Sequence, residues 1–242
     1  MEIISTSTES LRVTPEQQKA VEILTEFSKH MVVMAFLDND TPENPSDLAK
    51  EIYQVHDHLV AGCLRNGTKL PCQKGCFWCC FLRVKVTPLE VFGIVDYLQS
   101  SLQPGELPAL RQRIAETDNI TRGLGGQRRV RARKICPLII DNTCLVYPVR
   151  PITCRTYHSL YTSDCEALLD DDQQSVSIRL DISAMGMGLL AGLTDGLRQA
   201  GLQTRPLELI AGLRIALDEP ESMRRWLAGE PLFSEAEIES AK

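Results

Sequence analysis

Residues 72–80 read CQKGCFWCC and set the character of the chain, because four cysteines stand within nine residues. On a helix, steps of about 100° per residue would place these four thiols on one face. In a loop shaped by Pro71 and Gly75, the same spacing would let several thiolates surround one ion. Cys79 and Cys80 are adjacent, so their side chains should diverge and one of them would serve a second site. The segment predicts a metal-binding centre.

Four more cysteines lie downstream, two of them in the apolar stretch CPLIIDNTCLVY at residues 136–147. Free cysteine is often a buried small hydrophobe, but four in nine residues argue against that interpretation for the first group. Eight thiolates would fill two four-ligand sites, whether tetrahedral zinc or a cubane iron–sulfur cluster, and seven would leave one position open. The candidate ligands are Cys72, Cys76, Cys79, Cys80, Cys136, Cys144, Cys154 and Cys165.

The outermost cysteines need separate interpretations. Cys165 follows Ser163, a candidate helix cap, and a helix N-terminus there would lower the pKa of the thiol. Cys165 is therefore either a ligand or a redox thiol. Cys63 shares a predicted helical face with Ile52 and Leu59, so we assign it to the core and not to the ligands.

Histidine adds little to the ligand set. His56 and His58 would point about 200° apart on a helix and cannot clamp one ion, so they are interpreted as surface or half-buried residues. His158 follows Cys154 by four residues on a short helix predicted to begin at Pro151, so both side chains could face one site. Whether His158 is a ligand stays open.

The composition is that of an ordinary globular protein. Hydrophobic residues make up 43% of the 242 residues and charged residues 24%. The net charge of -6 argues against general nucleic-acid binding. The longest apolar stretch, residues 182–193, is too short for a membrane span and predicts a buried helix. The opening MEIISTSTES lacks secretory features, so we expect a cytoplasmic protein whose nine cysteines are not disulfides.

Hydrophobic periodicity predicts a mostly α fold with a small β-hairpin or sheet element around the cysteine metal cluster. Thr87-Pro88-Leu89-Glu90 is a capping box that should start a helix. Asp141-Asn142 should turn a hairpin. We expect an N-terminal helical segment (1–66), a cysteine-cluster metal-binding domain (67–165) and a C-terminal helical segment (166–242), packed as one domain. The predicted helices span 15–37, 47–65, 88–102, 104–123, 178–200, 206–218 and 221–228, and a strand spans 82–86.

Basic residues flank many of the candidate ligands. Four thiolates around Zn²⁺ or a cubane leave a charge of about -2, which needs donors and cations nearby. The run RRVRARK at residues 128–134 lacks interleaved aromatic residues, so it is interpreted as a solvated segment leading to the cluster and not as a nucleic-acid site. The candidate cations are Lys74, Arg83, Arg133, Lys134, Arg150 and Arg155.

Together these motifs resemble the YkgJ-type cysteine cluster proteins, a family described as zinc- or iron-chelating. The resemblance rests on CQKGCFWCC (72–80), VTPLEV (86–91) and CPLIIDNTCLVYPVRPITCRTY (136–157), about a third of the chain. It implies chelation without a common activity. A related branch contains bacterial flagellin lysine methylases, which suggests an iron–sulfur methylase-like or redox enzyme as an alternative.

The choice of metal rests on spacing. Cys72, Cys76 and Cys79, with Trp78 before the last, fit the CxxxCx(aromatic)C spacing by which radical S-adenosylmethionine enzymes hold a cubane cluster. The chain lacks the strand–helix alternation of such enzymes, so the spacing only favours iron–sulfur slightly over zinc. A structural zinc interaction module is the third alternative. The expected partner is a metal ion or cluster, with no membrane or nucleic acid, and no protein partner is indicated.

Overall fold

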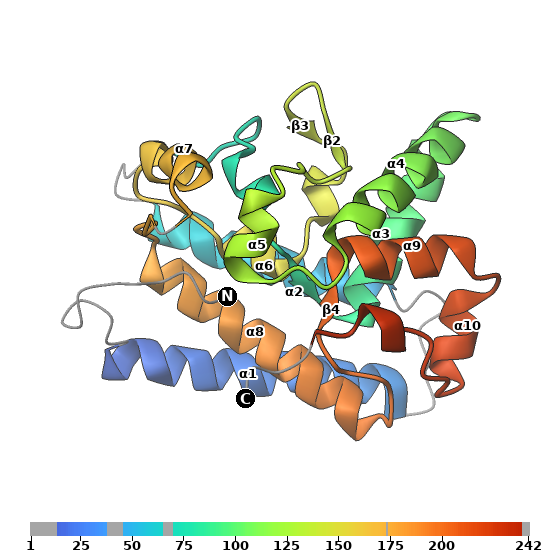
Figure 1. Cartoon of the computed structure of the whole chain (residues 1–242). Helices are drawn as coiled ribbons and strands as arrows, with labels where there is room; N and C mark the ends of the chain where they lie inside the picture. Colours follow the sequence, from blue (N-terminus) through green and yellow to red (C-terminus); the bar gives the residue numbers. More distant parts are fainter. Residues whose placement is uncertain (1–13, 38–45, 65–69, 173, 239–242) are drawn as a thin grey trace.

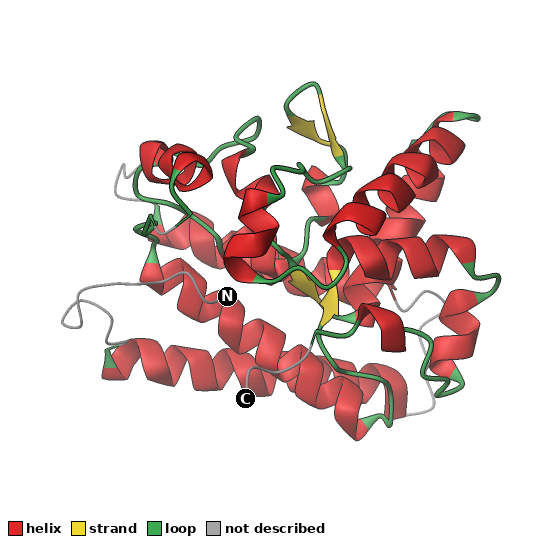
Figure 2. Ribbon diagram, in the orientation of Figure 1, coloured by secondary structure: helices red, strands yellow, loops and turns green. Residues whose placement is uncertain are grey.

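The computed structural model describes residues 14–37, 46–64, 70–172 and 174–238. These residues are mostly helical and carry two small antiparallel sheets, which confirms the predicted fold class (Figure 2). Strand β1 (Lys85–Val86) pairs with β4 (Leu207–Glu208), and β2 (Ile139–Ile140) pairs with β3 (Thr143–Cys144). No helix in these described ranges is both long and apolar enough to cross a membrane. The N-terminal residues 1–10 and the predicted boundary at 66/67 lie outside the described residues.

Two long helices, α1 (Pro15–Leu37) and α8 (Leu180–Gln199), pack closely along one side of the molecule (Figure 1). A Cβ atom at Gly192 would come within 2.0 Å of the Thr25 carbonyl oxygen, so the approach requires glycine. The Ser28 hydroxyl donates to the Leu189 carbonyl across this contact at 2.7 Å. The apolar stretch within α8 therefore contributes a buried helix, as the sequence predicts.

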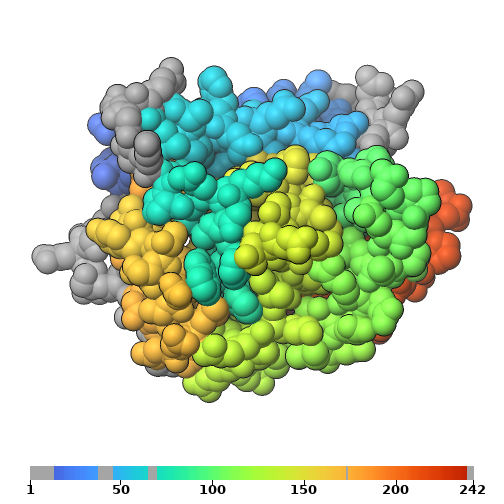
Figure 3. All heavy atoms as spheres, turned by 90° about the horizontal axis from the view of Figure 1, so that it is seen from above, coloured from blue at the N-terminus to red at the C-terminus, as the bar shows by residue number. Residues whose placement is uncertain are grey.

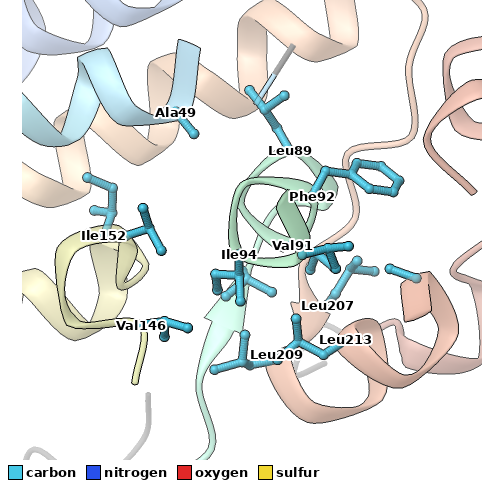
Figure 4. Close-up of a cluster of buried hydrophobic side chains, with 14 of the residues drawn as sticks. Ala49, Leu89, Val91, Phe92, Ile94, Val146, Ile152, Leu207, Leu209 and Leu213 are labelled. Atoms are coloured by element: carbon cyan, nitrogen blue, oxygen red, sulfur yellow. The ribbon is translucent and has the colours of Figure 1, made fainter. Parts of the chain in front are cut away.

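Helix α3 (Pro88–Ser101) is the centre of the core, between α2 (Ser46–Cys63) and α9 (Leu209–Asp218). Its predicted capping box is present, since the Glu90 amide donates to Thr87 Oγ1 at 3.3 Å and the Thr87 amide donates to Glu90 Oε2 at 2.8 Å. Val146 lies two residues after Cys144, and Ile152 lies two residues before Cys154. Figure 4 shows both side chains pointing toward the same apolar cluster as α3. The cysteine region is therefore anchored to the main core.

The remaining helices surround this centre. Helix α4 (Glu106–Thr121) packs on α9, where buried Asp118 pairs with Arg122 at 2.5 Å and with Arg214 at 2.9 Å. The other elements are α5 (Gly126–Arg131), α6 (Ile152–Thr156), α7 (Thr162–Asp170), α10 (Ser222–Leu227) and the 3₁₀ turns η1 (Trp78–Phe81), η2 (Tyr147–Val149) and η3 (Ser234–Ala236).

Three predicted elements differ from the structure. The helix expected from residue 206 begins at Leu209, because residues 207–208 pair with β1 as strand β4. The strand expected over 82–86 is limited to β1, since the 3₁₀ turn η1 extends to Phe81. Part of the run expected to be solvated forms α5. A strand partner distant in sequence accounts for the first of these differences.

Candidate metal centre

The cysteine-bearing stretches lie side by side on one face of the molecule, seen in Figure 3 as the teal, yellow and orange surface. Backbone and side-chain hydrogen bonds join these stretches. The Cys136 amide donates to the Cys80 carbonyl at 2.9 Å, and the Ser159 amide donates to Cys72 Sγ at 3.3 Å. The Thr153 hydroxyl donates to the Lys85 carbonyl at 2.7 Å. These bonds connect three separate parts of the chain, residues 72–85, residue 136 and residues 153–159.

The segment at residues 72–80 is a loop followed by a 3₁₀ turn, so the loop alternative holds and the helical one does not. Gly75 has a φ of 100°, which suits glycine. Within the segment, the Cys76 amide donates to the Gln73 carbonyl at 2.9 Å. The Cys80 thiol lowers the pKa of Cys79, and the Cys79 thiol raises the pKa of Cys80. The expectation that these adjacent side chains diverge stays a prediction.

Burial controls the acidity of the thiols farther along the chain. It raises the pKa of Cys136 to about 12 and the pKa of Cys154 well above its ordinary value. Thiolate charge at Cys79 and Cys144 raises the pKa of Cys154 further, and the guanidinium of Arg150 lowers it. These thiols thus act on one another's pKa, and a cation would stabilise their ionised forms.

The thiols of Cys72, Cys76 and Cys165 form a second neighbourhood. Burial raises the pKa of Cys72 to about 11, against the effect of the Ser159 amide, and the Cys76 thiol raises it further. Burial likewise raises the pKa of Cys165 to about 12.

The prediction that Cys165 would be acidified at a capped helix start is wrong. Helix α7 has Tyr161 at its N-cap with no side-chain hydrogen bond, and Ser163 lies inside the helix. Desolvation therefore outweighs any benefit of the helix start.

The two arginines that flank Cys154 in the sequence differ in burial: Arg150 is half-buried and Arg155 is buried. Arg150 lies over the Tyr147 ring at 4.0 Å. The Arg155 side chain is 1% exposed and donates to Asp57 Oδ2 at 2.5 Å. The other candidate cations differ: Arg133, for example, is exposed and pairs with Asp170 at 3.1 Å. Arg150 is thus the candidate cation whose charge acts on several thiols, those of Cys79, Cys144 and Cys154.

Glu90 has a second role that the sequence does not reveal. Besides capping α3, its Oε1 atom accepts from the Ile152 amide at 2.9 Å and from the Tyr53 hydroxyl at 3.4 Å. The carboxyl is fully buried, and burial raises its pKa. Glu90 therefore holds the start of α6, the helix that carries Cys154. Glu90 and Ile152 are separated by 62 positions, so no local sequence pattern predicts this hydrogen bond.

Arg129 contradicts the interpretation of residues 128–134 as a solvated run. It is 1% exposed and donates through Nη1 to the Lys134 carbonyl at 2.6 Å. Its Nε and Nη2 atoms have no hydrogen-bond partner among the described residues. Burial lowers the pKa of Arg129, and the charges of Glu208 and Cys136 raise it. A guanidinium with free donors thus lies near a candidate ligand.

The histidines and Cys63 also differ in part from expectation. His56 is buried and His58 is exposed, so they do not share a site, but His56 is not the half-buried or surface residue we expected. His158 lies beyond the end of α6 at Thr156 and does not share that helix with Cys154. Burial and the charge of Arg150 lower the pKa of His158 to about 4. Cys63 is half-buried at the end of α2 and lies outside the core.

In the described parts of the chain, no group of three or more His, Cys, Asp or Glu side chains is arranged so that it could hold a metal ion as it stands. Each thiol is carried by one rotatable bond, so a change of rotamer would re-aim it without moving the backbone. The donor type suits zinc or an iron–sulfur cluster, because both take thiolate ligands. The free N–H donors of Arg129 suit the negative charge of such a centre.

Comparison with known proteins adds no relative: no family model matches the chain, no curated protein is similar to it, and no solved structure matches its fold.

Proposed function

We propose that this protein holds a cysteine-ligated metal centre, with an iron–sulfur cluster favoured over zinc, and that it resembles the YkgJ-type cysteine cluster proteins in this respect. The supporting observation is the mutual influence of thiols from separate stretches. The charges of Cys79, Cys136 and Cys144 all act on Cys154, in a neighbourhood that also contains Arg150. Bringing several buried thiols together is costly unless they bind something that keeps them ionised.

The surroundings supply what a charged thiolate centre requires. Half-buried Arg150 acts on the thiol of Cys154, buried Arg129 acts on that of Cys136, and Arg129 has two N–H groups without a partner among the described residues. Arg155 and Glu90 hold the backbone that precedes Cys154, by hydrogen bonds to the Arg150 carbonyl and from the Ile152 amide. When bound, the metal would supply folding free energy and, if a coordination position were open, a site for electron transfer or substrate binding.

The cysteines also support a reducing location. All nine are free thiols in the structure. Disulfides are rare in the cytoplasm, where metal-binding and redox thiols are common. We therefore propose a cytoplasmic location.

Metal analysis after anaerobic purification tests the proposal. A brown protein with iron and acid-labile sulfide is the expected result. A colourless protein with stoichiometric zinc would keep the metal centre but replace the cluster with a structural zinc module. A Cys63→Ser variant should keep the full metal content, whereas Cys154→Ser should lose it in part or whole. Protein that takes up neither metal contradicts the proposal.

A further inference from the structure

Helix α1 exposes large apolar side chains on the face that does not pack on α8. Figure 1 shows this helix along the lower edge of the molecule. One face of α1 is buried against α8, through Ser28 and Val32. The exposed large hydrophobic residues of α1 lie outside the main core and are 42–59% exposed: Ile23, Phe27, Met34 and Leu37. Contiguous exposed apolar side chains of this kind mark an interaction surface.

These residues have the spacing of a seam between two helices. From Ile23 to Leu37 they follow one another at steps of four, three, four and three residues, with His30 at the middle step. Ala20 extends the series by one step of three toward the start of the helix. This alternation is the heptad pattern of helices that pack side by side. We call the set the α1 stripe; it consists of Ala20, Ile23, Phe27, His30, Met34 and Leu37.

The charges of α1 favour an antiparallel copy of the same helix as the partner. All charged residues of α1 precede position 30, and residues 30–37 contain no Asp, Glu, Lys or Arg. A parallel copy would place Glu22 and Glu26 beside the same carboxylates of the second helix. In an antiparallel pair, the charged half of each helix lies against the neutral half of the other, and the helix dipoles oppose each other. An anionic membrane surface fits less well, because α1 carries three glutamates and two lysines.

We propose that α1 is the contact surface of a symmetric homodimer, in which the α1 stripes of two copies pack antiparallel. The two-fold axis then passes between positions 28 and 29. Ile23 lies against Met34 of the second copy and Phe27 against His30 of the second copy, and each contact occurs twice. This inference goes beyond the proposed function and does not depend on it.

The size of the contact sets the expected strength of the dimer. The α1 stripe spans 18 positions, from 20 to 37, and is therefore about 27 Å long. Two such stripes bury roughly 1,000 Å² in total, which is near the lower limit for a specific interface. The dissociation constant should therefore lie in the micromolar range.

Sedimentation equilibrium of the full chain over a range of concentrations measures the dimer. A reductant is included, so that the free thiols do not cross-link two copies. Ile23→Glu and Met34→Lys should each weaken dimerisation by about 100-fold or more, because each dimer would bury two charges among apolar side chains. Ile120→Lys is the control and should dimerise like the wild type, because Ile120 is 50% exposed on α4, outside the stripe. Circular dichroism checks that each variant is folded.

The combined variant, Ile23→Glu with Met34→Lys, tests the antiparallel register. It places the new carboxylate against the new ammonium group of the second copy, twice in each dimer. Dimerisation should therefore recover by about tenfold or more relative to either single variant, and added salt should weaken it. A combined variant that does not recover overturns the antiparallel register.

The wild type and the two single variants decide whether the α1 stripe is a dimer contact at all. A wild type that remains monomeric at about 100 µM overturns the proposal. A dimer that neither single substitution weakens also overturns it, because the contact then lies elsewhere. Flotation of a monomeric wild type with vesicles that contain phosphatidylserine would assign the stripe to a membrane surface instead.

Discussion

Replacing Arg155 with methionine tests whether this buried guanidinium holds the loop that presents Cys154. Its Nε donates to the Arg150 carbonyl at 2.8 Å, and its Nη2 donates to the Pro148 carbonyl. Its guanidinium also lies over the Tyr53 ring at 4.5 Å. Three contacts to two elements thus depend on one side chain that is 1% exposed.

The loss in the free energy of unfolding can be worked out from the hydrogen-bond acceptors that lose their donor. Methionine keeps much of the apolar volume but leaves the Arg150 and Pro148 carbonyls without this donor. The hydrogen bonds to these carbonyls are part-buried, and an unsatisfied group costs about 1–3 kcal/mol when it is buried. Asp57 is half-exposed, so loss of its ion pair with Arg155 adds little. The free energy of unfolding should therefore fall by about 3 kcal/mol.

Urea unfolding of the metal-free protein, followed by circular dichroism, measures this loss. Arg205→Met is the matched control, because Arg205 is 77% exposed and pairs with Glu237 on the surface. It should change the free energy of unfolding by less than about 0.5 kcal/mol. Equal losses in the two variants would refute the assignment. In the loaded protein, Arg155→Met should also weaken zinc binding by about 10–100-fold, as loss of an orienting group does.

Two further predictions concern the protonation of the core and the packing of its helices. Burial raises the pKa of Glu208 to about 7, so its ionisation opposes folding and the free energy of unfolding should fall as pH rises from about 4.5 to 7. Urea unfolding at several pH values should show that the free energy of unfolding of the wild type falls relative to that of Glu208→Gln by up to about 3 kcal/mol. If the difference between the two proteins did not change with pH, ionisation of Glu208 would not be the cause. Gly192→Ala would place a Cβ 2.0 Å from the Thr25 carbonyl oxygen and should destabilise the protein by about 3 kcal/mol or more. The exposed Met187→Ala on the same helix is its control, and equal thermal stability of these two variants would contradict the close packing.

Local signals predicted much of the fold because they act within a few residues. The capping box at Thr87 and Glu90 starts α3, and Pro15 starts α1. Asp141 and Asn142 both adopt positive φ angles in the predicted hairpin. Each of these features depends on the conformational preference of the residue itself.

Features that depend on distant partners could not be predicted in this way. Glu208 belongs to a strand because it pairs with Lys85, far away in sequence. Arg129 is buried although its neighbours in the basic run suggest solvent. The spacing of residues 72–80 identified the candidate site, but the hydrogen bond between Ile152 and Glu90 that positions α6 required the folded chain.

The coordination shell of the bound metal tests the central claim most directly. X-ray absorption at the metal edge of anaerobically purified protein should show a first shell made of sulfur, at about 2.3 Å if the metal is zinc. Substituting Cys154 should change that shell, because the charges of Cys79, Cys136 and Cys144 all act on this thiol. A first shell of oxygen and nitrogen, or a shell unchanged by every cysteine substitution, would contradict the account.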